Sequence, residues 1–135
     1  MFSRLALPRR RVDGTTPRFT VLDRYGRTIR VSTRQRSLDV RSADRWGREL
    51  LELAGEGRHV ALDMSEVRVV DSAGLGAIVA AAASLRDNGG DLSLYACTPD
   101  VRTLLELVRL HQLLDIYNTA GEFLLASDLP AEVAG

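Results

Sequence analysis

The chain has 135 residues, a formal net charge of zero and a hydrophobic share of 45%. This length suits one domain with a modest core, and the mixture of apolar and charged residues is typical of a globular protein. No run of about 18 apolar residues is present, which argues against a membrane span. The segment 1–11 is basic overall but lacks the apolar stretch of a signal peptide, so we expect a cytoplasmic protein.

The neutral total hides an uneven distribution of charge along the chain. Residues 1–48 contain 13 arginines and four aspartates, whereas residues 49–135 contain five arginines and 14 acidic residues. A basic half can attract nucleic acid. These arginines, however, are not interleaved with aromatic residues, and several fall where strands should face solvent. We therefore expect no direct contact with nucleic acid.

Residues 1–17 show no sustained periodicity. They contain two prolines, a glycine and three consecutive arginines, which predicts a flexible basic N-terminal arm. We expect the domain itself over residues 18–126 and a C-terminal tail over residues 127–135.

The domain is predicted to begin with a β-hairpin. Residues 18–23 and 28–33 are typical of strands, and a four-residue turn joins them. A polar link over residues 34–39 follows, and Ser42 is predicted to cap a helix that Gly55 and Gly57 end. The apolar residues of this helix recur at helical spacing: Ala43, Trp46, Gly47, Leu50 and Leu53.

Strands and helices alternate through the rest of the chain. We expect strands over residues 59–64, 67–70, 92–96 and 116–117. Helices are predicted from Ser72 to the turn at residues 88–90, from Thr98 onward, and over residues 121–126. The faces expected to be buried are Leu75, Ile78, Val79, Ala82 and Leu85 on the first of these helices, and Val101, Leu104, Leu105 and Val108 on the second.

This alternation predicts an α/β fold with parallel strands and right-handed crossovers. The leading hairpin adds an antiparallel pair, so we expect a small mixed sheet with about four α-helices. In a chain of this length, the helices need to cover only one face of the sheet.

The most informative motif is Asp71-Ser72-Ala73-Gly74-Leu75-Gly76, between an apolar strand and a long helix. It places Ser72 at the predicted N-cap, where a serine hydroxyl accepts a hydrogen bond from a free backbone N–H. The same position suits a phosphate on the hydroxyl, because free N–H groups and the helix dipole favour negative charge. From the residues alone, a plain helix cap and a phosphorylation site both stay open.

The sequence shows no catalytic constellation. His59 and His111 are isolated, and neither forms a metal-ligand spacing with Cys97, the single cysteine. Cys97 lies in an apolar strand segment, so we interpret it as a buried packing residue. The segment Gly74-Leu75-Gly76 lacks the lysine of a phosphate-binding loop. We therefore expect no enzyme, no metal and no cofactor.

Residues 61–76, which end in Asp-Ser-Ala-Gly-Leu-Gly, resemble the signature of the STAS domain family, and more closely that of bacterial anti-sigma factor antagonists. The likeness continues through Asn88-Gly89-Gly90 and through Thr98-Pro99-Asp100-Val101, where a further helix opens. It covers residues 18–126. The resemblance implies a single STAS-like domain.

The resemblance also implies a partner-switching function. Such antagonists bind an anti-sigma factor that is also a serine kinase, and so free its sigma factor. Phosphorylation by that kinase ends the binding, and a serine phosphatase restores it. By this resemblance, Ser72 is the phosphoacceptor and Asp39 lies near it. The partner-binding loop is then formed by Asp71, Ser72, Ala73, Gly74, Leu75 and Gly76.

The chain departs from the family pattern at one point in this region. Arg36 and Ser37 stand where the family motif has Gly-Glu ahead of Leu38-Asp39. We expect Arg36 to form part of the partner-facing rim, where an arginine can pair with a phosphate or with a carboxylate of the partner. An alternative function stays open: a STAS-like binding module in a stress-signalling scaffold or lipid-transport complex, without a phosphoswitch.

Overall fold

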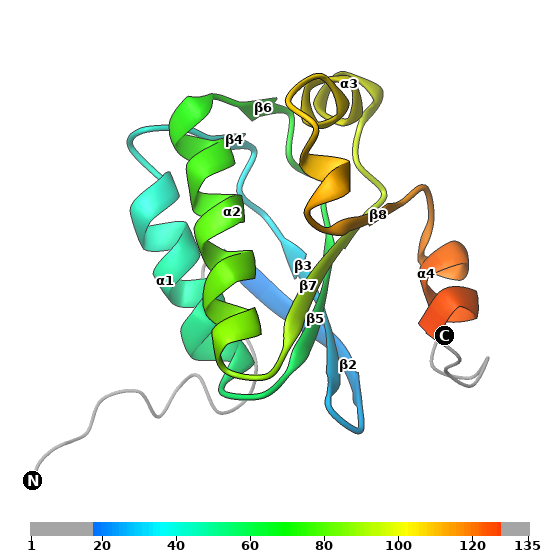
Figure 1. Ribbon diagram of the computed structural model, residues 1–135. Helices are drawn as coiled ribbons and strands as arrows, with labels where there is room; N and C mark the ends of the chain where they lie inside the picture. Colours follow the sequence, from blue (N-terminus) through cyan, green and yellow to red (C-terminus); the bar gives the residue numbers. More distant parts are fainter. Residues whose placement is uncertain (1–17, 128–135) are drawn as a thin grey trace, which may run out of the picture.

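In a computed structural model that describes residues 18–127, the chain forms a five-stranded mixed sheet with helices on both faces (Figure 1). The strand order is β2-β3-β5-β7-β8, and every neighbouring pair after the first is parallel. The predicted α/β fold with a leading antiparallel hairpin is therefore confirmed. The predicted N-terminal arm, and the predicted tail beyond residue 127, lie outside the described residues.

The hairpin consists of β2 (Phe19–Tyr25) and β3 (Thr28–Thr33). Its turn has only two residues between the strands, and Gly26 adopts a φ of 60° there. Glycine reaches this left-handed region without steric cost. The first strand therefore extends closer to the turn than the sequence predicted, whereas the second has the predicted bounds. The pairing register shifts between Val21 and Asp23, so a bulge interrupts the edge strand.

The parallel strands are β5 (His59–Asp63), β7 (Asp91–Tyr95) and β8 (Asp115–Tyr117). The helices are α1 (Ala43–Ala54), α2 (Ser72–Asp87), α3 (Pro99–Leu107), the short 3₁₀ helix η2 (Leu110–Gln112) and α4 (Ala120–Ser127). Each agrees with the predicted position to within a few residues, apart from η2, which the sequence pattern did not indicate.

A second, two-stranded sheet lies beside the start of α2 (Figure 1). It pairs β4 (Ser37–Leu38) with β6 (Val69–Val70) in parallel. The sequence predicted a polar link where β4 lies and a longer strand where β6 lies. Val67 is instead fully buried in the turn before β6, and its N–H donates to the Met64 carbonyl at 3.0 Å. This small sheet brings the segment after β4 to the start of α2.

The main core lies between the sheet and the pair α1 and α2, which lie side by side on one face (Figure 1). Trp46 is its largest fully buried side chain. The indole N–H of Trp46 donates to the Thr33 hydroxyl at 3.1 Å, and its ring contacts Phe19. This hydrogen bond satisfies the only polar atom of the indole, so Trp46 joins the core without an unsatisfied donor.

The buried face of α2 differs from the prediction. Its buried residues are Gly74, Ile78, Ala81, Ala82 and Leu85. Leu75 is only half-buried, and Val79 keeps 40% of its surface exposed. The helix packs against α1 as well as the sheet, so its buried face is turned toward α1. The small side chains at 81 and 82 permit that close contact.

The buried face of α3 (Pro99–Leu107) also differs in part from the prediction. In α3, Val101 and Leu105 are buried as predicted, whereas Leu104 is half-buried and Val108 is exposed. The helix opens at Thr98 as the sequence predicted, and the Thr98 hydroxyl caps it by accepting from the Val101 N–H at 3.4 Å.

The expectation that helices cover only one face is wrong. Helix α4 lies on the opposite face from α1 and α2 (Figure 1), where Phe123 stacks on Tyr95 at 6.1 Å between ring centroids. Beside this contact, Arg30 is buried and pairs with Asp23 at 2.5 Å. The Asp23 hydrogen bond raises the pKa of Arg30, and burial raises the pKa of Tyr95 to about 12. The second face thus carries its own small apolar cluster and an ion pair in which the arginine is buried and the aspartate is partly exposed.

Candidate functional site

Ser72 is the first residue of α2, and the N-cap is Asp71. The Asp71 backbone is extended, and its carboxylate Oδ1 accepts from the Gly74 N–H at 2.9 Å. The prediction that Ser72 caps the helix is therefore wrong by one residue. The side chain of Ser72 is exposed, and the capping bond does not depend on its hydroxyl.

Asp71 also fastens the neighbouring loop to the helix. Its Oδ2 accepts from the Val40 N–H at 3.2 Å, and its own N–H donates to the Leu38 carbonyl at 3.2 Å. One carboxylate therefore ties the start of α2 to the segment that follows β4. The structure thereby brings Asp39 and Val40 beside the predicted acceptor loop.

Asp39 shapes that segment through local hydrogen bonds. Its Oδ1 accepts from the Arg41 N–H at 3.0 Å, and its carbonyl accepts from the Ser42 N–H at 3.0 Å. Ser42 precedes α1 as predicted, but its side chain makes no capping bond; its hydroxyl donates to the Ser37 carbonyl at 2.8 Å instead. These bonds hold the loop in a tight turn and leave Val40 projecting, with 76% of its surface exposed.

The two glycines of the motif have different physical roles. A Cβ on Gly74 would lie 2.1 Å from the Leu38 carbonyl oxygen, so only glycine fits where β4 crosses the helix. A Cβ on Gly76 would meet nothing within 4 Å. Gly74 is thus explained by packing. Packing does not explain Gly76, which leaves the helix surface bare one turn after Ser72.

Arg36 lies at the end of the two-stranded sheet that is away from Ser72. Its carbonyl accepts from the N–H groups of Arg68, at 2.7 Å, and Val69, at 3.2 Å. That pairing sets it at the start of the two-stranded sheet, whereas Ser72 follows the other end. Its side chain is exposed. Val40 is nearer to the acceptor loop, and the sequence pattern gave no signal for it because the two-residue strands that place it are too short to recognise.

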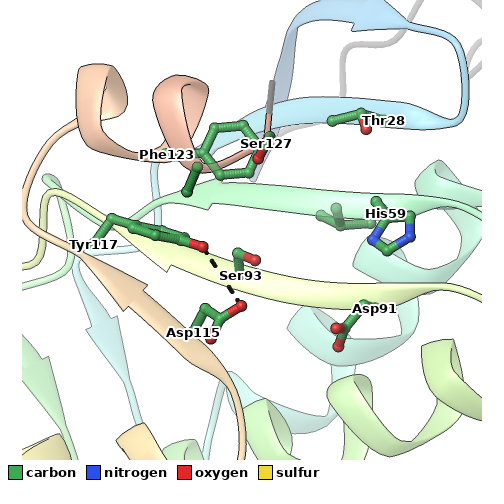
Figure 2. A pocket seen from close by; sticks show the side chains of 10 residues that line it. Thr28, His59, Asp91, Ser93, Asp115, Tyr117, Phe123 and Ser127 are labelled. Atoms are coloured by element: carbon green, nitrogen blue, oxygen red, sulfur yellow. Dashed lines mark hydrogen bonds between the residues drawn. The ribbon is translucent and has the colours of Figure 1, made fainter. Parts of the chain in front are cut away.

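A polar pocket of about 280 Å³ lies elsewhere, between the sheet and α4 (Figure 2). It opens at the amino ends of the parallel strands, and its lining includes His59, Asp91, Asp115 and Tyr117. The Tyr117 hydroxyl lies 3.5 Å from an Asp115 carboxylate oxygen, and burial is the main cause that raises the pKa of Tyr117. Ser72 follows β6 at the opposite ends of the strands, so this pocket is separate from the acceptor loop.

The remaining candidate chemical groups are scattered. Cys97 lies two residues beyond β7, not within a strand, and is only partly buried; burial raises the pKa of its thiol to about 11. His111 is exposed in η2. Over residues 18–127, no three His, Cys, Asp or Glu side chains gather where they could hold a metal ion. No helix in that same range is long and apolar enough to cross a membrane.

Comparison with known proteins adds a family and a set of relatives. A family model described as the STAS domain matches residues 23–123. Anti-sigma-B factor antagonists of Listeria monocytogenes and Listeria innocua are each 36% identical over 67 residues, which is half of this chain. The match spans 59% of the length of these curated relatives.

Solved structures show the same fold. A crystal structure described as a candidate anti-sigma factor antagonist from Thermotoga maritima is 25% identical, with a TM-score of 0.63, and the match covers 72% of this chain and 86% of that one. An antagonist from Mycobacterium paratuberculosis is 22% identical, with a TM-score of 0.66 and coverage of 83% and 97%. The murine anion transporter Slc26a9 is 16% identical, with a TM-score of 0.70, over 78% of this chain and 18% of the transporter.

Proposed function

We propose that this chain, which belongs to the STAS domain family, is an anti-sigma factor antagonist that phosphorylation of Ser72 switches off. The unmodified form binds an anti-sigma factor that is also a serine kinase, and thereby frees a sigma factor. A serine phosphatase reverses the modification. We place this exchange in the cytoplasm, without a cofactor and without direct contact to nucleic acid.

One observation carries this proposal: Ser72 is exposed at the start of α2, while the neighbouring Asp71 makes the helix cap. A serine that is needed as the cap would lose its structural role on modification. Here the capping bond survives, because it runs from the Gly74 N–H to the Asp71 carboxylate. A kinase can therefore modify the hydroxyl while the fold is retained.

The charges around Ser72 explain how one phosphate ends binding. A phosphoserine carries nearly two negative charges at neutral pH. Asp71 precedes it in the chain, and Asp39 lies in the loop that Asp71 holds. To bind a partner surface that is suited to the neutral serine, the modified protein would have to remove water from this added charge, which costs free energy. A penalty of about 3 kcal/mol weakens binding roughly a hundredfold, which is enough for a switch.

The proposed interface is centred on Ser72. It consists of the motif residues Asp71 to Gly76, the turn at Asp39 and Val40, and Arg36 at the rim. Val40 is the largest apolar surface in that turn, and an exposed apolar side chain beside polar residues is typical of a protein-binding surface. Arg36 is an outer contact in this proposal, because the register of β4 sets it away from the acceptor.

The experiment begins with the serine-kinase anti-sigma factors encoded in the same genome, each purified and mixed with this chain. Calorimetry identifies the one that binds, and ATP is then added to that pair. Mass spectrometry should find one phosphate, on Ser72. Ser65 is the matched control, because it is also an exposed serine, in the turn after β5.

The Ser65→Ala variant should be phosphorylated as well as the wild type, and the Ser72→Ala variant should stay unmodified. Phosphate on another residue, with Ser72 untouched, would contradict the assignment. If none of the purified anti-sigma factors binds, the alternative of a passive STAS-like binding module gains over the antagonist.

A further inference from the structure

The face of the sheet that α4 covers is apolar in one part and polar in another. Ala61 and Tyr95 pack against Phe123 and Leu124 of α4 and form the apolar part. Nearer the amino ends of the strands, the residues that pair across the sheet on this face are polar: Thr28 with His59, His59 with Asp91, and Ser93 with Asp115. Parallel sheets usually bury apolar side chains on both faces. Core packing therefore does not explain this polar patch.

The polar patch lines the pocket of about 280 Å³ described above. Figure 2 shows Ser93 of β7 between two sides of the pocket, with Asp115 and Tyr117 on one side and His59 on the other. Phe123 of α4 lies over them. A concave site in which a few polar groups converge beside aromatic rings is typical of a small-molecule site, and this volume is just below the range for drug-sized ligands.

Several polar groups of the pocket have hydrogen-bonding capacity that the described part of the chain does not use. Within residues 18–127, the Ser93 hydroxyl and the His59 imidazole form no hydrogen bond. The Asp115 carboxylate accepts only from the Tyr117 hydroxyl, at the long distance of 3.5 Å. A serine hydroxyl and a neutral imidazole can each donate and accept. A bound ligand with polar groups would therefore find partners here without breaking existing bonds.

The charges of the pocket favour a positive ligand. Among the described residues, its lining includes two carboxylates and no arginine. Asp91 is already balanced, because the Arg86 Nε donates to its Oδ1 at 3.2 Å. Asp115 forms no ion pair within residues 18–127. A cationic group beside Asp115 would gain a charge-assisted hydrogen bond.

The rings and the donor set narrow the kind of cation. Tyr117 and Phe123 both line the pocket, and organic cations are attracted to aromatic rings. No three His, Cys, Asp or Glu side chains of residues 18–127 are placed to hold a metal ion. The lining therefore suits an organic cation better than a metal.

We propose that this pocket binds a small organic cation with a primary ammonium or guanidinium group. Asp115 pairs with the cationic group beside the Tyr117 ring, and Ser93 and His59 bind a second polar group of the ligand. The pocket is separate from Ser72, so the assignment goes beyond the proposed function and does not depend on it.

Calorimetry of the isolated chain, in a buffer without amines, tests the assignment with putrescine and agmatine as probes. At least one of them should bind with a Kd below about 1 mM. The uncharged analogue 1,4-butanediol has the same chain length as putrescine and should not bind. Failure of both cations to bind, or equal binding of the diol, would overturn the proposal.

Two substitutions separate the pocket from general attraction between charges. Asp115→Asn keeps the shape of the side chain and should weaken binding about tenfold or more. Asp44→Asn is the matched control, because Asp44 is an exposed aspartate on α1, on the opposite face of the sheet, and it should bind like the wild type. Equal losses for both variants, or no loss for either, would overturn the proposal.

A second variant covers the case in which Asp115→Asn lowers the melting temperature. Ser127 lines the pocket from the end of α4, so Ser127→Arg introduces a competing cation there and should also weaken binding about tenfold or more. Nuclear magnetic resonance locates the probe: titration should shift the backbone amide signals of Thr28, Ser93 and Asp115. Shifts confined to other parts of the chain would overturn the proposal.

Discussion

The Asp71 carboxylate accepts a hydrogen bond from the Val40 N–H at 3.2 Å while it caps α2 through Gly74. The residue before the proposed phosphoacceptor is therefore a structural joint between two loops of the proposed interface. Ser72 itself makes no capping bond. Substitutions at these two neighbouring positions should therefore have different effects on the stability of the fold.

Asp71→Ala should destabilise the fold by about 1–2 kcal/mol, because it removes the cap and the bond to Val40. Ser72→Ala should change the free energy of unfolding by no more than about 0.5 kcal/mol, as for an exposed substitution that touches no cap. Urea unfolding of both variants measures this difference. A larger loss of stability for Ser72→Ala than for Asp71→Ala would indicate that Ser72, and not Asp71, caps the helix.

Gly74→Ala should be strongly destabilising, by about 2 kcal/mol or more, since the new methyl group would collide with the Leu38 carbonyl oxygen. Gly76→Ala is the matched control in the same helix. Its Cβ meets open space, so it should stabilise the helix by about 0.5–1 kcal/mol. Melting temperatures that fall equally for both variants would contradict the close crossing of β4 over Gly74.

Ile78→Ala should cost about 2–5 kcal/mol, because Ile78 is fully buried between α2 and the sheet. Val79→Ala, one residue along, should cost under about 1 kcal/mol, because much of Val79 is already in solvent. Denaturant midpoints of the two variants separate the buried face from the exposed one. Similar losses at both positions would show that the helix is turned differently.

The Cys97 thiol should react slowly with alkylating reagents at pH 8, since burial raises its pKa to about 11. An unfolded chain would ionise this thiol near its ordinary pKa of about 8.5. The folded state therefore keeps this proton up to a higher pH than the unfolded state does. The stability that the protonated thiol contributes is lost as pH rises from about 8.5 through about 11.

Unfolding measured across this pH range should show a smaller decline for Cys97→Ala than for the wild type. An identical decline in both proteins, together with rapid alkylation at pH 8, would contradict the protected thiol.

The sequence predicted the order of strands and helices because each element has a clear period and the turns have recognisable residues. Its prediction for the buried face of α2 was only partly right, because Ile78, Ala82 and Leu85 are buried whereas Val79 is exposed. This helix has alanine or glycine on nearly every side, so the apolar pattern does not determine its rotation. The contact with α1 decides it, and that contact comes from residues far away in the chain.

The candidate site was predicted to a similar extent. The motif correctly placed Ser72 at the start of α2, but Asp and Ser are equally good N-caps, so the pattern could not tell which of the two neighbours makes the bond. The position of Val40 beside the start of α2 depends on the two-residue pairing of β4 with β6. Strands this short produce no sequence pattern of their own.

Partner binding is proposed to depend above all on the charge of residue 72. Calorimetry of the wild type, Ser72→Ala and Ser72→Asp against the anti-sigma factor measures this dependence without any other change to the surface. We expect the wild type and Ser72→Ala to bind alike, and Ser72→Asp to bind at least tenfold more weakly although circular dichroism shows it folded. One charge replaces nearly two, so the mimic can fall short of the phosphate itself. Equal affinity for all three folded proteins would contradict the switch and leave Ser72 as ordinary surface.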